Sequence, residues 1–300
     1  MLSLAFSGSG AAGAAEPSYP SLSGEAMFEV QLEHATDSDD PDNKITETFG
    51  RSEIAARLAI SDRLFIDSYL VASPLADGDP GEDRFFDDEG IYVEEIMVVY
   101  ENGPYTGFAG KFDPGFGVAW DYGRGIWSED FAEDYEIYEK IGFGGSYTLE
   151  TAHGGTHVFT ASTFFNDTTV LSGSAFTRIE KLDLSDGGAG NTEDFSSFAG
   201  SLTGVNAGGV DSLTYQLALR HLEAADVSAT GDDEQGVAAN LGYVIPLCEA
   251  VALDTLVEVA NISNFEGEAE DRRYLYASAI ARIHEHWNVA FGYTARTMDP

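Results

Sequence analysis

The chain has 300 residues, enough for one large β domain or two ordinary ones. Its 52 acidic and 15 basic residues give a formal net charge of −37, which argues against nucleic-acid binding, because that function needs basic patches. Apolar residues make up 43% and aromatic residues 12%, more than a disordered acidic chain carries. Cys248 is the single cysteine, so an internal disulfide is excluded.

Residues 1–15 read MLSLAFSGSGAAGAA and are followed by Glu16-Pro17. The small residues at 13–15 are typical of a signal-peptide cleavage site, so we predict a signal-peptide remnant here. A flexible Gly/Ala/Ser tail is the alternative. Residues 16–300 would then form one domain.

In separate segments between residues 26 and 296, apolar and polar residues alternate with a period of two, which is typical of β-strands. Helical spacing is nearly absent, apart from a turn or two expected in 131–140. No stretch reaches the ~18 apolar residues of a membrane-spanning helix. The segments with this alternation, clear ones first, are 26–33, 53–60, 141–149, 213–220, 251–259 and 287–296, then 64–72, 91–100, 105–112, 157–166, 197–205, 236–245 and 273–283.

The connections between these segments alternate in length along the chain, as in an up-and-down membrane barrel with tight turns at one end and long loops at the other. We therefore predict an all-β, antiparallel, up-and-down transmembrane β-barrel of about 12–14 strands. Bacterial barrels use even numbers, so 14 is the number expected, with the last strand missing from this chain or one strand misassigned. The short connections are 61–63, 102–104, 151–155, 206–211, 246–249 and 284–286; the long ones are 37–44, 74–89, 113–134, 167–195, 222–235 and 261–271.

One face of nearly every predicted strand is apolar, whereas the other carries charged and amide side chains. A lumen this polar is no dry core, so the apolar face should lie in lipid, in a bacterial outer membrane. A half-buried sheet with a solvated polar face is the alternative. The residues expected to face lipid include Ile54, Leu58, Phe143, Leu217, Val257 and Phe291, and those expected in an aromatic girdle are Tyr100, Tyr105, Tyr147, Tyr243 and Trp287.

Three acidic clusters lie in long connections, at 37–42, 77–89 and 129–139. They would enrich cations at the channel mouth. They also offer oxygen ligands for loosely bound Ca²⁺ or Mg²⁺, although a solvated surface explains them equally. No other cofactor is expected.

The connection 113–134 is unusually aromatic for an exposed loop, so we predict that it folds into the lumen and narrows it, with Trp120 or Trp127 against the wall. Capping the rim, or packing on a second copy in a homo-oligomer, are alternatives. The candidate pore-lining and constriction residues are Lys111, Asp113, Trp120, Trp127, Arg220, Asp254, Glu258, Arg282 and Arg296. Mutual pairing of these charges is the other interpretation.

Three stretches, GKFDPGFG (110–117), DFAEDYE (130–136) and IGFGGSY (141–147), together resemble proteobacterial porin-like proteins similar to the siderophore-porin family. The segment ASTFFNDTTVLS (161–172) fits the same group. The resemblance covers about 90–296 and implies an outer-membrane barrel that works without TonB. It transfers no defined binding residues.

The sequence thus predicts a passive channel for small solutes, with siderophore uptake as the narrower possibility, and no enzymatic activity. No nucleophile elbow, P-loop or zinc-ligand spacing is present. A structural or adhesive barrel with a closed lumen is the alternative. A hydrolase at the rim, using His221 and Asp226, is less favoured. Expected partners are small solutes and outer-membrane lipid.

Overall fold

The computed structural model describes residues 18–38, 42, 44–76, 79–122, 128–177, 179, 181–225, 231–284 and 286–299. It divides into two compact units. The first comprises Met1–Tyr100, Ala109–Phe112 and Asp167–Asp183; the second comprises Glu101–Phe108, Asp113–Asn166 and Leu184–Pro300. The predicted signal-peptide remnant, residues 1–15, lies outside the described residues.

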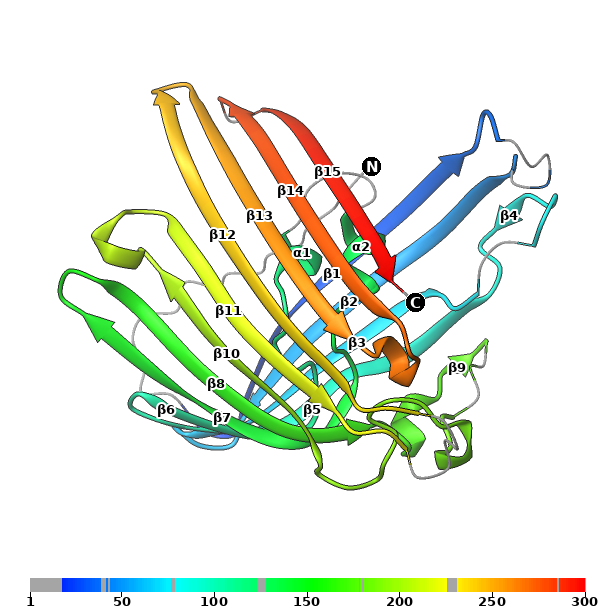
Figure 1. Ribbon diagram of the computed structural model, residues 1–300, viewed down its shortest axis with the longest axis horizontal. Helices are drawn as coiled ribbons and strands as arrows, with labels where there is room; N and C mark the ends of the chain where they lie inside the picture. The colour runs from blue at the N-terminus through cyan, green and yellow to red at the C-terminus, as the bar shows by residue number, and fades with distance from the viewer. Residues whose placement is uncertain are drawn as a thin grey trace. The chain divides into compact units, whose positions relative to one another are not determined.

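The first unit contains an antiparallel sheet whose neighbouring strands follow the chain order (Figure 1). Two short strands are added to this sheet: β4 (Arg84–Phe85) runs parallel to β2, and β9 (Ala175–Phe176) pairs with β5. The long strands are β1 (Ser21–His34), β2 (Thr46–Ala59), β3 (Leu64–Pro74) and β5 (Glu89–Asn102).

The second unit is a longer antiparallel run of the same kind, again paired in chain order. Residues 105–108 of β6 (Tyr105–Phe112) belong to this unit, and residues 109–112 belong to the first. The strands of the run are β7 (Lys140–Thr151), β8 (Gly155–Asn166), β10 (Ser197–Val205), β11 (Leu213–Leu222), β12 (Glu234–Cys248), β13 (Val251–Ser263), β14 (Asp271–Ile283) and β15 (Trp287–Asp299).

The all-β antiparallel fold class is confirmed. Thirteen strands of 8–15 residues occur in the described part of the chain, within the predicted range. The two-residue strands β4 and β9 were not predicted, because so short a segment carries no readable alternation. The connections alternate in length as predicted, in that each shorter one is shorter than its neighbours along the chain. The shorter ones are 60–63, 103–104, 152–154, 206–212, 249–250 and 284–286, and the longer ones are 35–45, 75–88, 113–139, 167–196, 223–233 and 264–270.

Helices are few and lie in the connections. The prediction of a helical turn in 131–140 was wrong in its bounds: α2 (Ser128–Glu133) begins earlier, α1 (Ala119–Tyr122) precedes it, and β7 begins at Lys140. Apolar aromatic residues packing inward hide any regular periodicity here. Among the described residues, no helix is long and apolar enough to cross a membrane. The 3₁₀ turns are η2 (Val170–Ser172), η3 (Leu184–Asp186), η4 (Ala207–Gly209) and η5 (Phe265–Gly267).

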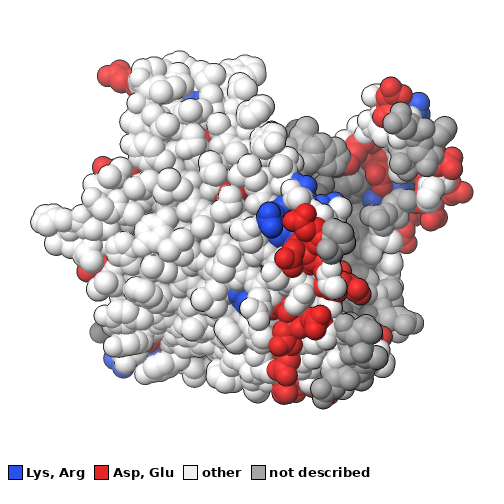
Figure 2. Space-filling model, viewed as in Figure 1, with Lys and Arg blue, Asp and Glu red and all other residues white. Residues whose placement is uncertain are grey.

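Side-chain exposure in the second unit reverses the polarity of a soluble protein. In the middle of β11 and β13 the exposed positions are apolar, at Leu217 (54% exposed), Leu219, Val257 (48%) and Val259. The intervening positions Gln216, Arg220 and Glu258 are buried. Strict alternation along a strand puts these two sets on opposite faces. Figure 2 shows the result over β12 to β15, a broad surface almost free of charged side chains, with acidic groups gathered toward the end where β14 begins.

Five of the six residues expected to face lipid are exposed, and their contact with lipid stays a prediction. Ile54, Phe143, Leu217, Val257 and Phe291 are exposed, and Leu58 is half-buried. Four of the five expected girdle aromatics, Tyr100, Tyr105, Tyr147 and Trp287, are exposed, and Tyr243 is half-buried.

Candidate functional site: a segment docked on a buried polar row

Four polar side chains lie side by side on the buried face of the second unit. In the sheet register Gln216 is opposite Asn240, Asn240 is opposite Glu258, and Glu258 is opposite Tyr276. Each residue is buried. We call Gln216, Asn240, Glu258 and Tyr276 the polar row. It crosses β11 to β14, and its members share one face because consecutive antiparallel strands keep paired residues on the same side.

The connection 113–139 docks on this row through its backbone, and we call its described residues, 113–122 and 128–139, the inner segment. Gly117 N–H donates to Gln216 Oε1 at 2.9 Å. Val118 N–H donates to Glu258 Oε2 at 2.7 Å, and Ala119 N–H donates to Glu258 Oε1 at 3.1 Å. These bonds satisfy backbone groups that would otherwise be buried without a partner, an arrangement that costs free energy.

Glu258 is the centre of the contact. Besides the two N–H groups, it accepts a hydrogen bond from the Tyr135 hydroxyl at 2.7 Å and one from Asn240 Nδ2 at 3.0 Å. Glu258 is 1% exposed. A buried carboxylate is tolerated when hydrogen bonds replace its hydration, and hydrogen bonds to a charged acceptor are stronger than neutral ones.

Tyr135 holds the other end of the inner segment. Burial raises the pKa of its hydroxyl well above the ordinary value, and the neighbouring negative charge of Glu258 raises it further. The hydroxyl therefore stays protonated and remains a donor to Glu258. The Tyr135 ring packs against Tyr274 with centroids 4.8 Å apart, and Phe131 packs on Tyr274 at 5.7 Å.

A buried ion pair lies beside the row. Arg220 Nη2 and Glu234 Oε1 are 2.6 Å apart, and the two side chains are 3% and 2% exposed. Arg220 Nη1 also donates to the Tyr135 carbonyl at 2.6 Å, and its guanidinium lies over the Phe116 ring at 4.6 Å. Arg220 therefore contacts the inner segment at two residues, Phe116 and Tyr135.

Gly117 fits where a larger residue would not. Its φ is +88°, a left-handed conformation that side chains disfavour. A Cβ placed there would be 3.0 Å from Glu258 Oε1 and 3.1 Å from Tyr135 Cε2. The close approach of the backbone to the polar row therefore depends on this glycine.

Three more of the predicted pore-lining residues bind or belong to the inner segment. Arg296 of β15 forms an ion pair with Asp134. Asp113 Oδ1 accepts the Glu139 N–H at 2.6 Å and so closes the base of the segment. Trp120 is half-buried within it. Trp127 lies outside the described residues.

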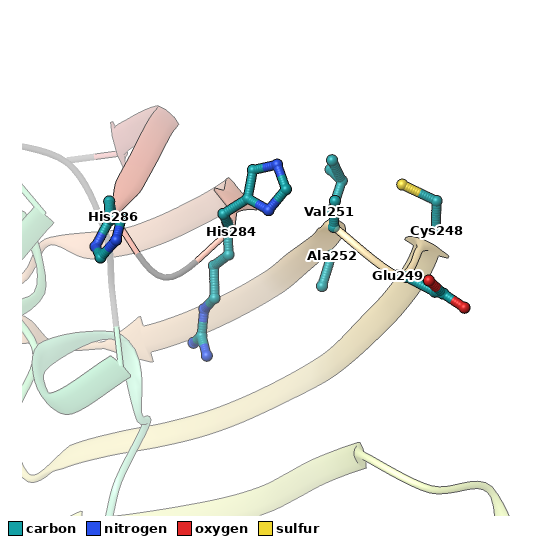
Figure 3. Close-up of a pocket in the computed structure, with 8 residues that line it drawn as sticks. Cys248, Glu249, Val251, Ala252, His284 and His286 are labelled. Carbon is teal, nitrogen blue, oxygen red and sulfur yellow. The ribbon is translucent and has the colours of Figure 1, made fainter.

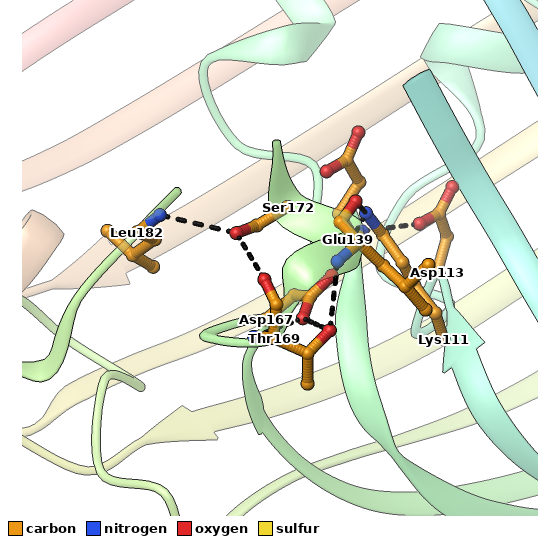
Figure 4. A network of polar contacts seen from close by, with 8 residues as sticks. Lys111, Asp113, Glu139, Asp167, Thr169, Ser172 and Leu182 are labelled. Carbon is orange, nitrogen blue, oxygen red and sulfur yellow. Dashed lines mark hydrogen bonds and ion pairs between the residues drawn. The ribbon is translucent and has the colours of Figure 1, made fainter. Parts of the chain in front are cut away.

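Lys111 belongs to the first unit and has a different environment. Its ammonium group is 3.1 Å from Asp167 Oδ2, with both side chains almost fully buried, and it donates to the Leu171 carbonyl at 2.9 Å. Figure 4 shows Asp167 together with Thr169, whose N–H and hydroxyl donate to Asp167 Oδ1. The Ser172 hydroxyl donates to the Thr169 carbonyl at 2.9 Å and accepts a hydrogen bond from the Leu182 N–H at 3.2 Å.

Arg282 and Asp254 pair with each other at 2.5 Å, away from the polar row and close to the short turns. Arg282 also lines a pocket formed by the turns that follow β12 and β14 (Figure 3). Cys248 at the end of β12 and Glu249 in the turn after it lie on one side of the pocket's lining, and His284 and His286 come from the other turn. In the described part of the chain, no group of three or more His, Cys, Asp or Glu residues could hold a metal ion. Loosely bound Ca²⁺ or Mg²⁺ stays a prediction.

His221, considered for a hydrolase, stacks on Phe198 with ring centroids 5.1 Å apart and lies 4.0 Å from Asp233. Its proposed partner Asp226 is outside the described residues.

Sequence reasoning missed several members of this site, which are Tyr135, Gln216, Glu234, Asn240 and Tyr276. Asn240 and Glu234 alternate with exposed Val237 and Leu241 in β12, so the period-two pattern carried a signal for them. Tyr135 gave no such signal, because it lies in a connection.

Comparison with known proteins finds no matching family model and no matching curated protein. Among solved structures, a quintuple mutant of the porin of Rh. blastica is similar at 11% identity, with 93% of this chain and 100% of that chain covered and a TM-score of 0.32.

Proposed function

We propose that this chain forms a porin-like outer-membrane barrel that conducts small solutes through a water-filled lumen. The polar row and the inner segment lie inside that lumen and narrow it. The proposal includes closure of the sheet into a barrel in the membrane, since unpaired strand edges are costly in lipid.

The observation that carries the proposal is the reversed polarity of β11 to β14. Apolar side chains such as Leu217, Val237 and Val257 are exposed, whereas Gln216, Asn240 and Glu258 on the same strands are buried. In water, exposing so many apolar side chains on one continuous face would be unfavourable. In a bilayer the same arrangement is stable, because lipid covers the apolar face.

A second candidate function is a structural barrel with a closed lumen. The observation that favours it is the tight packing of the inner segment, where Phe116, Ala119, Ala132, Tyr135 and Ile137 are all buried. The two candidates differ in one measurable property, which is whether solutes pass.

The experiment is reconstitution of the purified, refolded chain in planar bilayers and liposomes. We expect discrete conductance steps and liposome swelling with small sugars, declining as the sugar grows. Folding is checked separately by heat-modifiable gel mobility and protease resistance. Folded protein that gives neither conductance nor swelling would exclude the channel and favour the closed barrel.

A narrower proposal is TonB-independent uptake of iron–siderophore complexes, supported by the sequence resemblance at 110–117 and 130–147. Liposomes loaded with an iron-quenched dye test it. Ferric siderophore should enter faster than a sugar of equal size. Equal rates would exclude siderophore selectivity and would support a general channel for small solutes.

A further inference from the structure

We infer that Glu258 is the positioning residue of the inner segment: by accepting hydrogen bonds from Val118, Ala119 and Tyr135, it holds the described parts of that segment against the polar row and thereby sets the channel width. Glu258 acts through the segment and needs no contact with solute. The inference rests on the proposed channel function and adds the residue that controls it.

The donors to Glu258 identify its partner. Among the described residues, three of the four hydrogen bonds it accepts come from the inner segment, and one, from Asn240, comes from the strands. Asn240 is the one donor outside the segment among the described residues. The 1% exposure of Glu258 includes the cover that the segment provides, so the donors of the segment replace the water that docking excludes. Because a buried charge without hydrogen bonds is strongly unfavourable, the carboxylate and the docked segment stabilise each other.

The neighbouring ion pair has a different role. Glu234 is neutralised by Arg220 of the adjacent strand at 2.6 Å, so this pair compensates its own charges without the segment. Among the described residues no ion pair involves Glu258. The charge of Glu258 is therefore stabilised by donors of the inner segment, whereas the charge of Glu234 is stabilised by Arg220.

The first test is Glu258→Gln, which keeps the shape but replaces one carboxylate oxygen with an NH₂ group. That group is a donor and faces donors on either side, at Val118 and Asn240 or at Ala119 and Tyr135. We expect single-channel conductance to rise severalfold. Gly117→Ala should act in the same direction, since its Cβ would press on Glu258 and Tyr135. Asp299→Asn is the control in the same unit; Asp299 is exposed, pairs with Arg273 at 3.5 Å and should leave conductance unchanged.

A reversible disulfide crosslink measures directly whether the inner segment is docked. A Cβ built on Gly115 lies 3.6 Å from Ser201 Oγ, so side chains at these two positions are in contact. In a Cys248→Ser background, Gly115→Cys with Ser201→Cys should crosslink readily. The crosslinked yield should fall severalfold when Glu258→Gln is added, and the fraction that does crosslink should show wild-type conductance until reductant is added.

The outcomes separate the two claims. The positioning role would be overturned if the Glu258→Gln and Gly117→Ala proteins fold, crosslink to the same yield as the protein without these substitutions, and show wild-type conductance. A wild-type protein without conductance, whose crosslinking still falls in Glu258→Gln, would support the positioning role and refute the channel.

Discussion

Arg220 and Glu234 show what a single buried contact contributes to this protein. Their charged atoms are 2.6 Å apart and almost no solvent reaches them. Removing one partner leaves the other as a buried, unpaired charge. We therefore predict that Glu234→Ala lowers the free energy of unfolding by about 3–5 kcal/mol. Urea unfolding in detergent or vesicles, followed by tryptophan fluorescence, measures this change.

The control for that prediction is an exposed pair in the same unit. Arg273 and Asp299 lie 3.5 Å apart, with side chains 64% and 53% exposed. Asp299→Ala should cost less than about 1 kcal/mol, because water and ions already screen this pair. Equal effects of the two substitutions would contradict the assignment of Arg220 and Glu234 to a dry interior.

At the scale of an element, the outward face of β11 is expected to lie in lipid. Leu217 is exposed at the middle of the strand Leu213–Leu222. Leu217→Arg should therefore destabilise the folded barrel in vesicles by about 2–4 kcal/mol, as charges do at the membrane midplane. Leu149, near the turn end of β7, is also exposed, and Leu149→Arg should cost only about 0–1 kcal/mol. If both substitutions are equally tolerated in vesicles, the apolar face does not contact lipid.

For the whole molecule, the net charge of −37 and its concentration in the connections predict a channel that prefers cations. The reversal potential under a salt gradient should show this preference at low salt. The preference should shrink near 1 M, where the screening length falls to about 3 Å. Glu268 is exposed in the connection that follows β13, and Glu268→Lys should weaken the preference without affecting folding. Anion selectivity of the wild type at low salt would disprove the prediction.

The strands, their faces and the alternation of short and long connections were predictable from the sequence. A half-buried strand must alternate apolar and polar side chains, so β11 and β13 carry their own evidence in ten or more consecutive residues. The aromatic residues of 113–134 likewise indicated that this connection is not fully exposed, and Phe116 is buried. The ends of α2 and the short strands β4 and β9 were not predictable, because they depend on contacts with residues far away in the chain.

The sequence by itself determined that Glu258 lies on the polar face of β13, since that follows from its alternation with Val257 and Val259. Only the tertiary structure decided what that face meets. Sheet register places Glu258 beside Asn240, and docking brings Val118, Ala119 and Tyr135 to the same carboxylate across more than 120 positions of the chain. The physical reason is that period-two alternation is the same whether the polar face meets water or a folded segment. The partner is selected by hydrogen bonds between distant residues, and local sequence does not encode them.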